Sequence, residues 1–114
     1  MPEIKNSNFT ASFDVSYICD TSNNIISITL PTISGNEGKC VSIIRNGINN
    51  VIFNATISGC LNPELIEDKD YMQLAILGGE YKIIGSSGYR VSSNNKLWKL
   101  GIDSDGIITS STSI

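Results

Sequence analysis

The sequence predicts a single all-β domain, either an antiparallel β-sandwich or a jelly-roll-like barrel of short strands. β-Branched residues are abundant, with 19 isoleucines among 114 residues, and such side chains favour the extended backbone of a strand. Apolar and polar residues alternate with a period of two in several segments. Clusters of Asn, Ser, Gly and Asp separate these segments at short intervals, as expected for seven to nine strands joined by turns.

The length suits one domain, because 114 residues supply a single core of ordinary size. We expect residues 1–8 to form an N-terminal arm and residues 9–109 to form the sandwich. Residues 110–114 are a polar tail that either frays or pairs with another chain.

The N-terminal half predicts four strands. Residues from Phe9 to Asp20 alternate so regularly that they predict one long strand with one buried face, and only Ile18 breaks the pattern. Ile26 to Leu30 and Cys40 to Arg45 follow. Asn46-Gly47 then predicts a tight hairpin into a strand from Val51 to Ile57, because Asn-Gly favours the turns that match strand twist.

The segment from Leu61 to Leu77 is ambiguous. Pro63 at a first helical position predicts one helical turn near residues 63–67, followed by a strand from Tyr71 to Leu77 and a Gly78-Gly79 hairpin into Glu80–Ile84. The alternative is one helix from Pro63 to Ile76. Further on, the pattern predicts a short strand at 89–91 and a last hairpin of residues 97–102 and 106–109.

Charge and hydropathy exclude two classes of partner. A net charge of −3 argues against binding nucleic acid, which requires a basic face. No apolar run is long enough for a transmembrane helix. The start of the chain, Met1 to Lys5, lacks the layout of a signal peptide, so we expect no secretion by that route.

Catalytic and cofactor chemistry are not predicted. The chain has no His, which removes the commonest general base and the usual Ser-His and Cys-His pairs. Asp14 and Asp20 lie too far apart on one strand for a glycosidase pair. The acidic residues of segment 64–70 predict a solvated loop. We therefore expect a protein that is not an enzyme and uses no cofactor.

Metal sites are not predicted either. Cys19, Cys40 and Cys60 form no C-x-x-C pair, so we expect reduced, buried thiols without zinc. Asp103-Ser104-Asp105-Gly106 begins like a calcium loop, but it lacks the later acidic ligand and predicts a hairpin turn.

Aromatic side chains on strands are typical of core or interface, and their alternative role is a stacking platform for sugars. The candidates are Tyr17, Tyr71, Tyr81, Tyr89 and Trp98.

Some strands carry apolar residues on both sides, notably Ile43-Ile44, Val51-Ile52-Phe53 and Ile107-Ile108. A strand with one solvent-exposed face needs apolar residues only on its other face. The additional apolar residues therefore predict contacts between subunits. The candidate interface residues are Ile43, Ile52, Phe53 and Ile107. The substitution Ile52→Lys is then expected to dissociate an oligomer.

The stretch from Tyr17 to Ile84, more than half of the chain, resembles a recurring β-domain of viral and phage structural proteins, especially tail fibres and spikes. The matching segments are Tyr17-Ile18-Cys19-Asp20-Thr21-Ser22, Ile26-Ser27-Ile28-Thr29-Leu30-Pro31, Gly38 before Val41-Ser42-Ile43-Ile44, Asn50-Val51-Ile52-Phe53-Asn54, and Met72-Gln73-Leu74 before Gly79 and Tyr81-Lys82-Ile83-Ile84.

The resemblance implies a virion structural protein (a fibre, spike, or minor capsid or cement component), made in the host cytoplasm and located in the virion. It implies a homotrimer that also contacts other virion proteins. The alternative is a small module that binds a host receptor or glycan. A cytoplasmic regulatory domain is a further alternative without a supporting motif.

Overall fold

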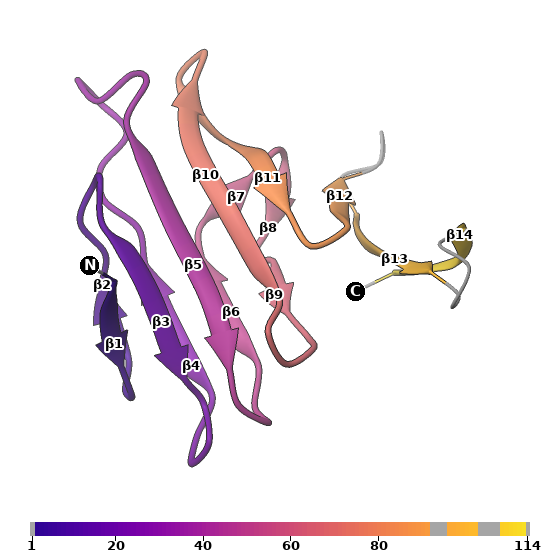
Figure 1. The fold of residues 1–114 in the computed structure, drawn as a ribbon. Helices are drawn as coiled ribbons and strands as arrows, with labels where there is room; N and C mark the ends of the chain where they lie inside the picture. Colours follow the sequence, from indigo (N-terminus) through magenta and orange to yellow (C-terminus); the bar gives the residue numbers. More distant parts are fainter. Residues whose placement is uncertain (1, 92–95, 103–107, 114) are drawn as a thin grey trace.

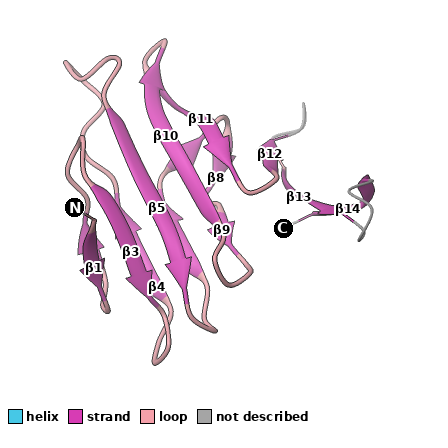
Figure 2. Cartoon of the chain, in the orientation of Figure 1, coloured by secondary structure: helices cyan, strands magenta, loops and turns pink. Residues whose placement is uncertain are grey.

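The computed structural model describes residues 2–91, 96–102 and 108–113, and its architecture confirms the all-β prediction (Figures 1 and 2). The described residues contain no helix. They form fourteen strands: β1 (Glu3–Lys5), β2 (Phe9–Thr10), β3 (Ser16–Asp20), β4 (Ile26–Thr29), β5 (Cys40–Asn46), β6 (Val51–Asn54), β7 (Thr56–Ile57), β8 (Cys60–Leu61), β9 (Glu64–Leu65), β10 (Tyr71–Leu77), β11 (Glu80–Ser86), β12 (Tyr89–Val91), β13 (Leu97–Ile102) and β14 (Ile108–Ser113).

The strands belong to three sheets. Sheet A has the order β1-β3-β5-β10-β11-β7-β8, sheet B the order β2-β4-β6-β9, and sheet C the order β12-β13-β14. Figure 1 shows β3, β5 and β10 of sheet A in one layer and β4 and β6 of sheet B behind them. The apolar residues between these two layers form the core of the molecule.

The first six strands alternate between the two layers, and this winding makes their neighbours parallel. β1, β3 and β5 pair in parallel in sheet A, and β2, β4 and β6 pair in parallel in sheet B. The chain therefore winds through three successive coils, each giving one strand to each sheet. The purely antiparallel arrangement predicted from the sequence is wrong here. Antiparallel pairing dominates from β7 onward, with the parallel pair of β7 and β11 as an exception.

The predicted Asn46-Gly47 hairpin is also wrong, because β5 and β6 lie in different sheets. This turn is an arch that stacks on the preceding one: Thr21 N–H donates to Asn46 O at 3.0 Å, and Asn49 Nδ2 donates to Thr21 O at 2.7 Å. Gly47 has φ 143°, and a Cβ placed there would lie 2.6 Å from Thr21 Oγ1. Gly is thus required for close stacking of the arches and not for a primed turn.

The long strand predicted from Phe9 to Asp20 is interrupted. The chain leaves sheet B after Thr10 and enters sheet A at Ser16, passing Asp14 with φ 61°. The predicted buried face is largely confirmed, since Ala11, Tyr17 and Cys19 are buried and their apolar neighbours pack against the core. Alternation therefore identified the inward side chains without revealing that the strand changes sheet.

The helical turn predicted near residues 63–67 is wrong, as is the longer helix from Pro63 to Ile76. β9 occupies this position and pairs with β6, with Leu65 fully buried. The β10–β11 hairpin at Gly78-Gly79 is confirmed. β13 and β14 pair as the last hairpin requires, while its turn residues 103–107 lie outside the described residues. Residues 110–113, predicted as a tail, continue β14.

Both layers contribute to a single core. Tyr81 on β11 of sheet A connects to the segment that follows β4 of sheet B, because its hydroxyl donates to Pro31 O at 2.6 Å. The largest fully buried side chains are those of Tyr81, Phe53, Ile26, Ile28, Ile43, Ile57, Leu65, Met72, Leu74, Ile76, Leu97 and Val41.

Candidate assembly surface

The outer face of sheet A carries a continuous row of apolar side chains, here called the apolar row. Ile4 is opposite Ile18, Ile18 opposite Ile44, and Ile44 opposite Tyr71. Ile4 is 71%, Ile44 37% and Tyr71 41% exposed, and Ile18 is half-buried. Directly opposed residues on adjacent strands lie about 5 Å apart, so the four side chains form one strip across β1, β3, β5 and β10.

The residues beside the apolar row are mostly uncharged. Towards one end of the strands, Ser16, Ser42 and Gln73 are opposite one another on β3, β5 and β10. Beyond them Cys40 is opposite Ala75. These positions on β3, β5 and β10 are therefore neutral and cost little to remove from water, and the nearest charge is Lys82, opposite Ala75 on β11.

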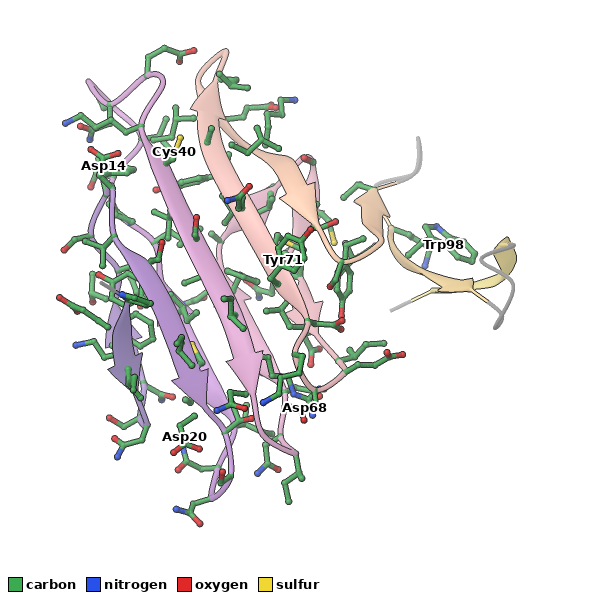
Figure 3. The ribbon with its side chains drawn as sticks, viewed as in Figure 1. Asp14, Asp20, Cys40, Asp68, Tyr71 and Trp98 are labelled. Carbon is green, nitrogen blue, oxygen red and sulfur yellow. The ribbon has the colours of Figure 1, made fainter. Side chains whose placement is uncertain are left out.

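Charges lie in a row at the other end of this face, here called the charged row. Asp20 is opposite Asn46, and Lys69 lies on the other side of Asn46, where its ammonium donates to Asn46 Oδ1. Ser22 Oγ and N–H donate to Asp20 Oδ1 at 2.6 and 3.1 Å, and these hydrogen bonds lower the pKa of Asp20 below 3.8. Asp68 lies 3.9 Å from Lys69 Nζ and accepts a hydrogen bond from Gly47 N–H. Figure 3 shows Asp20 and Asp68 at this end and Cys40 at the opposite end.

The outer face of sheet B is more polar. Thr10, Thr29 and Asn54 are opposite one another and exposed. In the adjacent row Ile52 lies between Ser27 and Glu64. An isolated half-buried isoleucine on such a face needs no partner.

The predicted interface residues are therefore distributed over three environments. Ile43 and Phe53 are fully buried in the core of the chain, so their side chains cannot reach another subunit, which corrects their assignment. Ile52 lies on the polar face of sheet B. Ile107 lies outside the described residues. The residues that form the apolar row were missed, although Ile18 had signalled it by interrupting the alternation of its segment.

The exposed edge at β1 is protected against strand addition. β1 has only three residues, and Lys5 lies 3.7 Å from Glu3 and 5.6 Å from the ring centre of Phe9. Short, charged edge strands discourage pairing with another chain. The face of sheet A, rather than this edge, is the surface available for a large contact.

The acidic segment before β10 is not simply the solvated loop that was predicted. Asp70 is only 4% exposed and accepts hydrogen bonds from Tyr89 Oη at 2.6 Å, Ser87 Oγ at 2.9 Å and Glu67 N–H at 3.0 Å. Burial, followed by the hydrogen bond to Asp70, raises the pKa of Tyr89. This carboxylate anchors β12 to the main body.

The thiols differ in their environments. Cys19 and Cys60 are buried as predicted, and burial raises the pKa of Cys19 to about 12. Cys40 is half-buried and lies on the outer face of β5, which corrects the prediction that all three are buried. Within the described residues no group of three His, Cys, Asp or Glu side chains could hold a metal ion.

The predicted aromatic platform does not form from the described tyrosines. Tyr17, Tyr81 and Tyr89 are buried, and Tyr81 has a pKa raised by burial to about 12. Tyr71 is exposed but belongs to the apolar row. Trp98 lies apart, on β13 (Figure 3).

Comparison with known proteins gives no match to any protein-family model or to any curated protein. In the described part of the chain, no helix has the length and hydropathy needed to cross a membrane.

Proposed function

We propose that this protein is a non-enzymatic structural subunit that works by packing the outer face of sheet A against another protein subunit. The observation that carries the proposal is the apolar row, a strip of four apolar side chains with Ser16, Ser42 and Gln73 on one side and the charged row on the other. Contiguous exposed apolar surface of this kind is typical of protein contacts, whereas the surface of a lone domain is more mixed.

The setting proposed for this subunit is a virion, as a fibre, spike or minor capsid component. The support for the virion is the resemblance of residues 17–84 to viral structural β-domains. The homotrimer that this resemblance implies is the competing assembly to a dimer. The receptor- or glycan-binding alternative has less support, because the buried tyrosines cannot stack on a sugar.

Self-association tests the proposal directly. Light scattering on the full chain over a micromolar to millimolar series is expected to show a mass above that of one chain. A monomer over the whole series would contradict assembly from copies of this chain.

The virion setting is tested separately by mass spectrometry of purified particles. Peptides of this protein are expected in the particles, and their absence would refute the virion setting.

A further inference from the structure

We propose that the partner on sheet A is a second copy of this chain, packed face to face about a two-fold axis parallel to β5. This inference rests on the proposed function, and it adds the partner and the geometry of the contact. Because β5 lies between β3 and β10 in sheet A, the rotation places β3 of each copy over β10 of the other.

Three of the four side chains of the apolar row complement one another under this rotation. Ile44 faces Ile44 of the second copy, and Ile18 faces Tyr71 of the second copy in both directions. Ser42 likewise faces Ser42, and Ser16 faces Gln73. Among these central residues apolar groups meet apolar groups, and hydroxyls meet hydroxyls or an amide. Ile4 takes no part in this match, because the rotation places β1 over β11.

The positions of the charged residues favour the two-fold axis parallel to β5. Asp20 and Lys69 flank Asn46 on opposite sides, so the rotation brings Asp20 of each copy to Lys69 of the other, forming two opposite-charge pairs. The hydrogen bonds from Ser22 orient the Asp20 carboxylate. Asp68, the acidic neighbour of Lys69, is held at the arch by Gly47 N–H.

The competing arrangement is a two-fold axis that crosses the strands along the apolar row. That rotation also superposes the row on itself, but it brings Asp20 opposite Ser16 and Lys69 opposite Gln73 of the second copy. Charges facing neutral groups lose hydration without gaining a partner. Charge complementarity therefore favours the axis along β5.

The size of the face predicts the strength of the contact. Four strands about 4.8 Å apart, with seven residues of about 3.3 Å each, make a face roughly 20 Å on a side. Its area of about 400 Å² is below the roughly 800 Å² per partner of a standard stable complex. We therefore expect a reversible dimer with a dissociation constant in the micromolar range or weaker.

Cys40 gives a direct test of the geometry, because it lies on β5 and hence beside the axis. Face-to-face sheets pack about 10 Å apart, so a bismaleimide with a spacer of about 10 Å can join the two Cys40 thiols. In the competing arrangement, Cys40 is four residues from Ile44, about 13 Å along the strand, which separates the two thiols by about 26 Å. Cys19 and Cys60 are buried and do not compete for the reagent.

With dilute reagent, the wild-type chain is expected to form a covalent dimer, and Cys40→Ser is expected to abolish this dimer.

A charge exchange tests the same geometry without cross-linking. Asp20→Lys and Lys69→Asp are each expected to raise the dimer Kd about tenfold, since each places like charges opposite one another, and the double variant is expected to restore it. Thermal unfolding of each variant separates loss of folding from loss of contact.

The outcomes distinguish this inference from the proposed function. A chain that stays monomeric overturns this inference and any assembly from copies of this chain. A trimer, a dimer without the Cys40 cross-link, or a double variant no tighter than the single variants overturns the two-fold geometry and leaves the structural role standing.

Discussion

The outer faces of sheets A and B are built from strands of the same coils, yet they present different surfaces. On sheet A the strand pairing places Ile4, Ile18 and Ile44 of the coils in one row, and Tyr71 of β10 extends it. On sheet B the corresponding positions hold Thr10, Thr29 and Asn54. Parallel stacking aligns equivalent positions of successive coils, so a single residue choice repeated in each coil becomes a stripe. One face is thereby suited to water and the other to a protein partner.

The largest effect is expected from contrasting the two sides of β5. Ile43 is fully buried and Ile44 is partly exposed. Ile43→Ala should lower the free energy of unfolding by about 2–5 kcal/mol, because it leaves a cavity in the core. Ile44→Ala should cost within about 1 kcal/mol. Chemical denaturation of both variants measures the difference. Equal losses would mean that Ile44 contributes to the core and not to an outer contact.

The next largest effect contrasts the two outer faces. Ile44→Lys places two ammonium groups opposite each other at the proposed axis and should raise the dimer Kd at least about 100-fold. Ile52→Lys serves as the matched control, because the new lysine on sheet B lies opposite Glu64 and should change the Kd less than about twofold.

Sedimentation equilibrium of both lysine variants measures this contrast. The sequence pattern alone had predicted dissociation by Ile52→Lys. If the Ile52→Lys variant dissociates and the Ile44→Lys variant stays dimeric, the contact lies on sheet B and not on sheet A.

Several features of the fold were predictable because they depend on local patterns. Tyr71–Leu77 was predicted with its observed bounds, and Cys40–Asn46 to within one residue. The parallel coils were not predictable in this way, since an Asn-Gly turn has the same composition in an arch and in a hairpin. Asn23-Asn24 and Asn49-Asn50 each precede an apolar strand, and this repeat was the available signal for stacked coils.

The assembly surface could be predicted only in part. A pair such as Ile43-Ile44 indicates that a strand is apolar on both sides, but the pattern does not say which side faces the core. That choice depends on register with Ile18 and Tyr71, which are distant in the sequence. The charged row was even harder to predict from the sequence. Lys69, whose ammonium donates to Asn46 Oδ1, itself has φ 68°, which lies outside regular strand geometry.

A smaller effect concerns thiol reactivity on the two sides of sheet A. In the native protein at mildly alkaline pH, Cys40 should react with a maleimide while Cys19 and Cys60 stay unmodified, because burial raises the pKa of both thiols. Labelling of Cys19 should be more than about tenfold slower than that of Cys40 until denaturant is added. Peptide mapping by mass spectrometry identifies the modified residue. Equal labelling of Cys19 would contradict its position in the core.

The smallest effect is expected at Asp20, whose carboxylate is exposed and accepts two hydrogen bonds from Ser22. Because those bonds lower its pKa, any stabilisation from the ionised carboxylate is complete above the usual value of 3.8 and is lost as pH falls through the lower, folded value. Ser22→Ala removes the hydroxyl bond, the larger cause, and should move the pKa of Asp20 upward. NMR titration of the Asp20 side chain measures this shift. An unchanged pKa would show that Ser22 does not orient the carboxylate, and the charged row would then lose the fixed anion that distinguishes sheet A from sheet B.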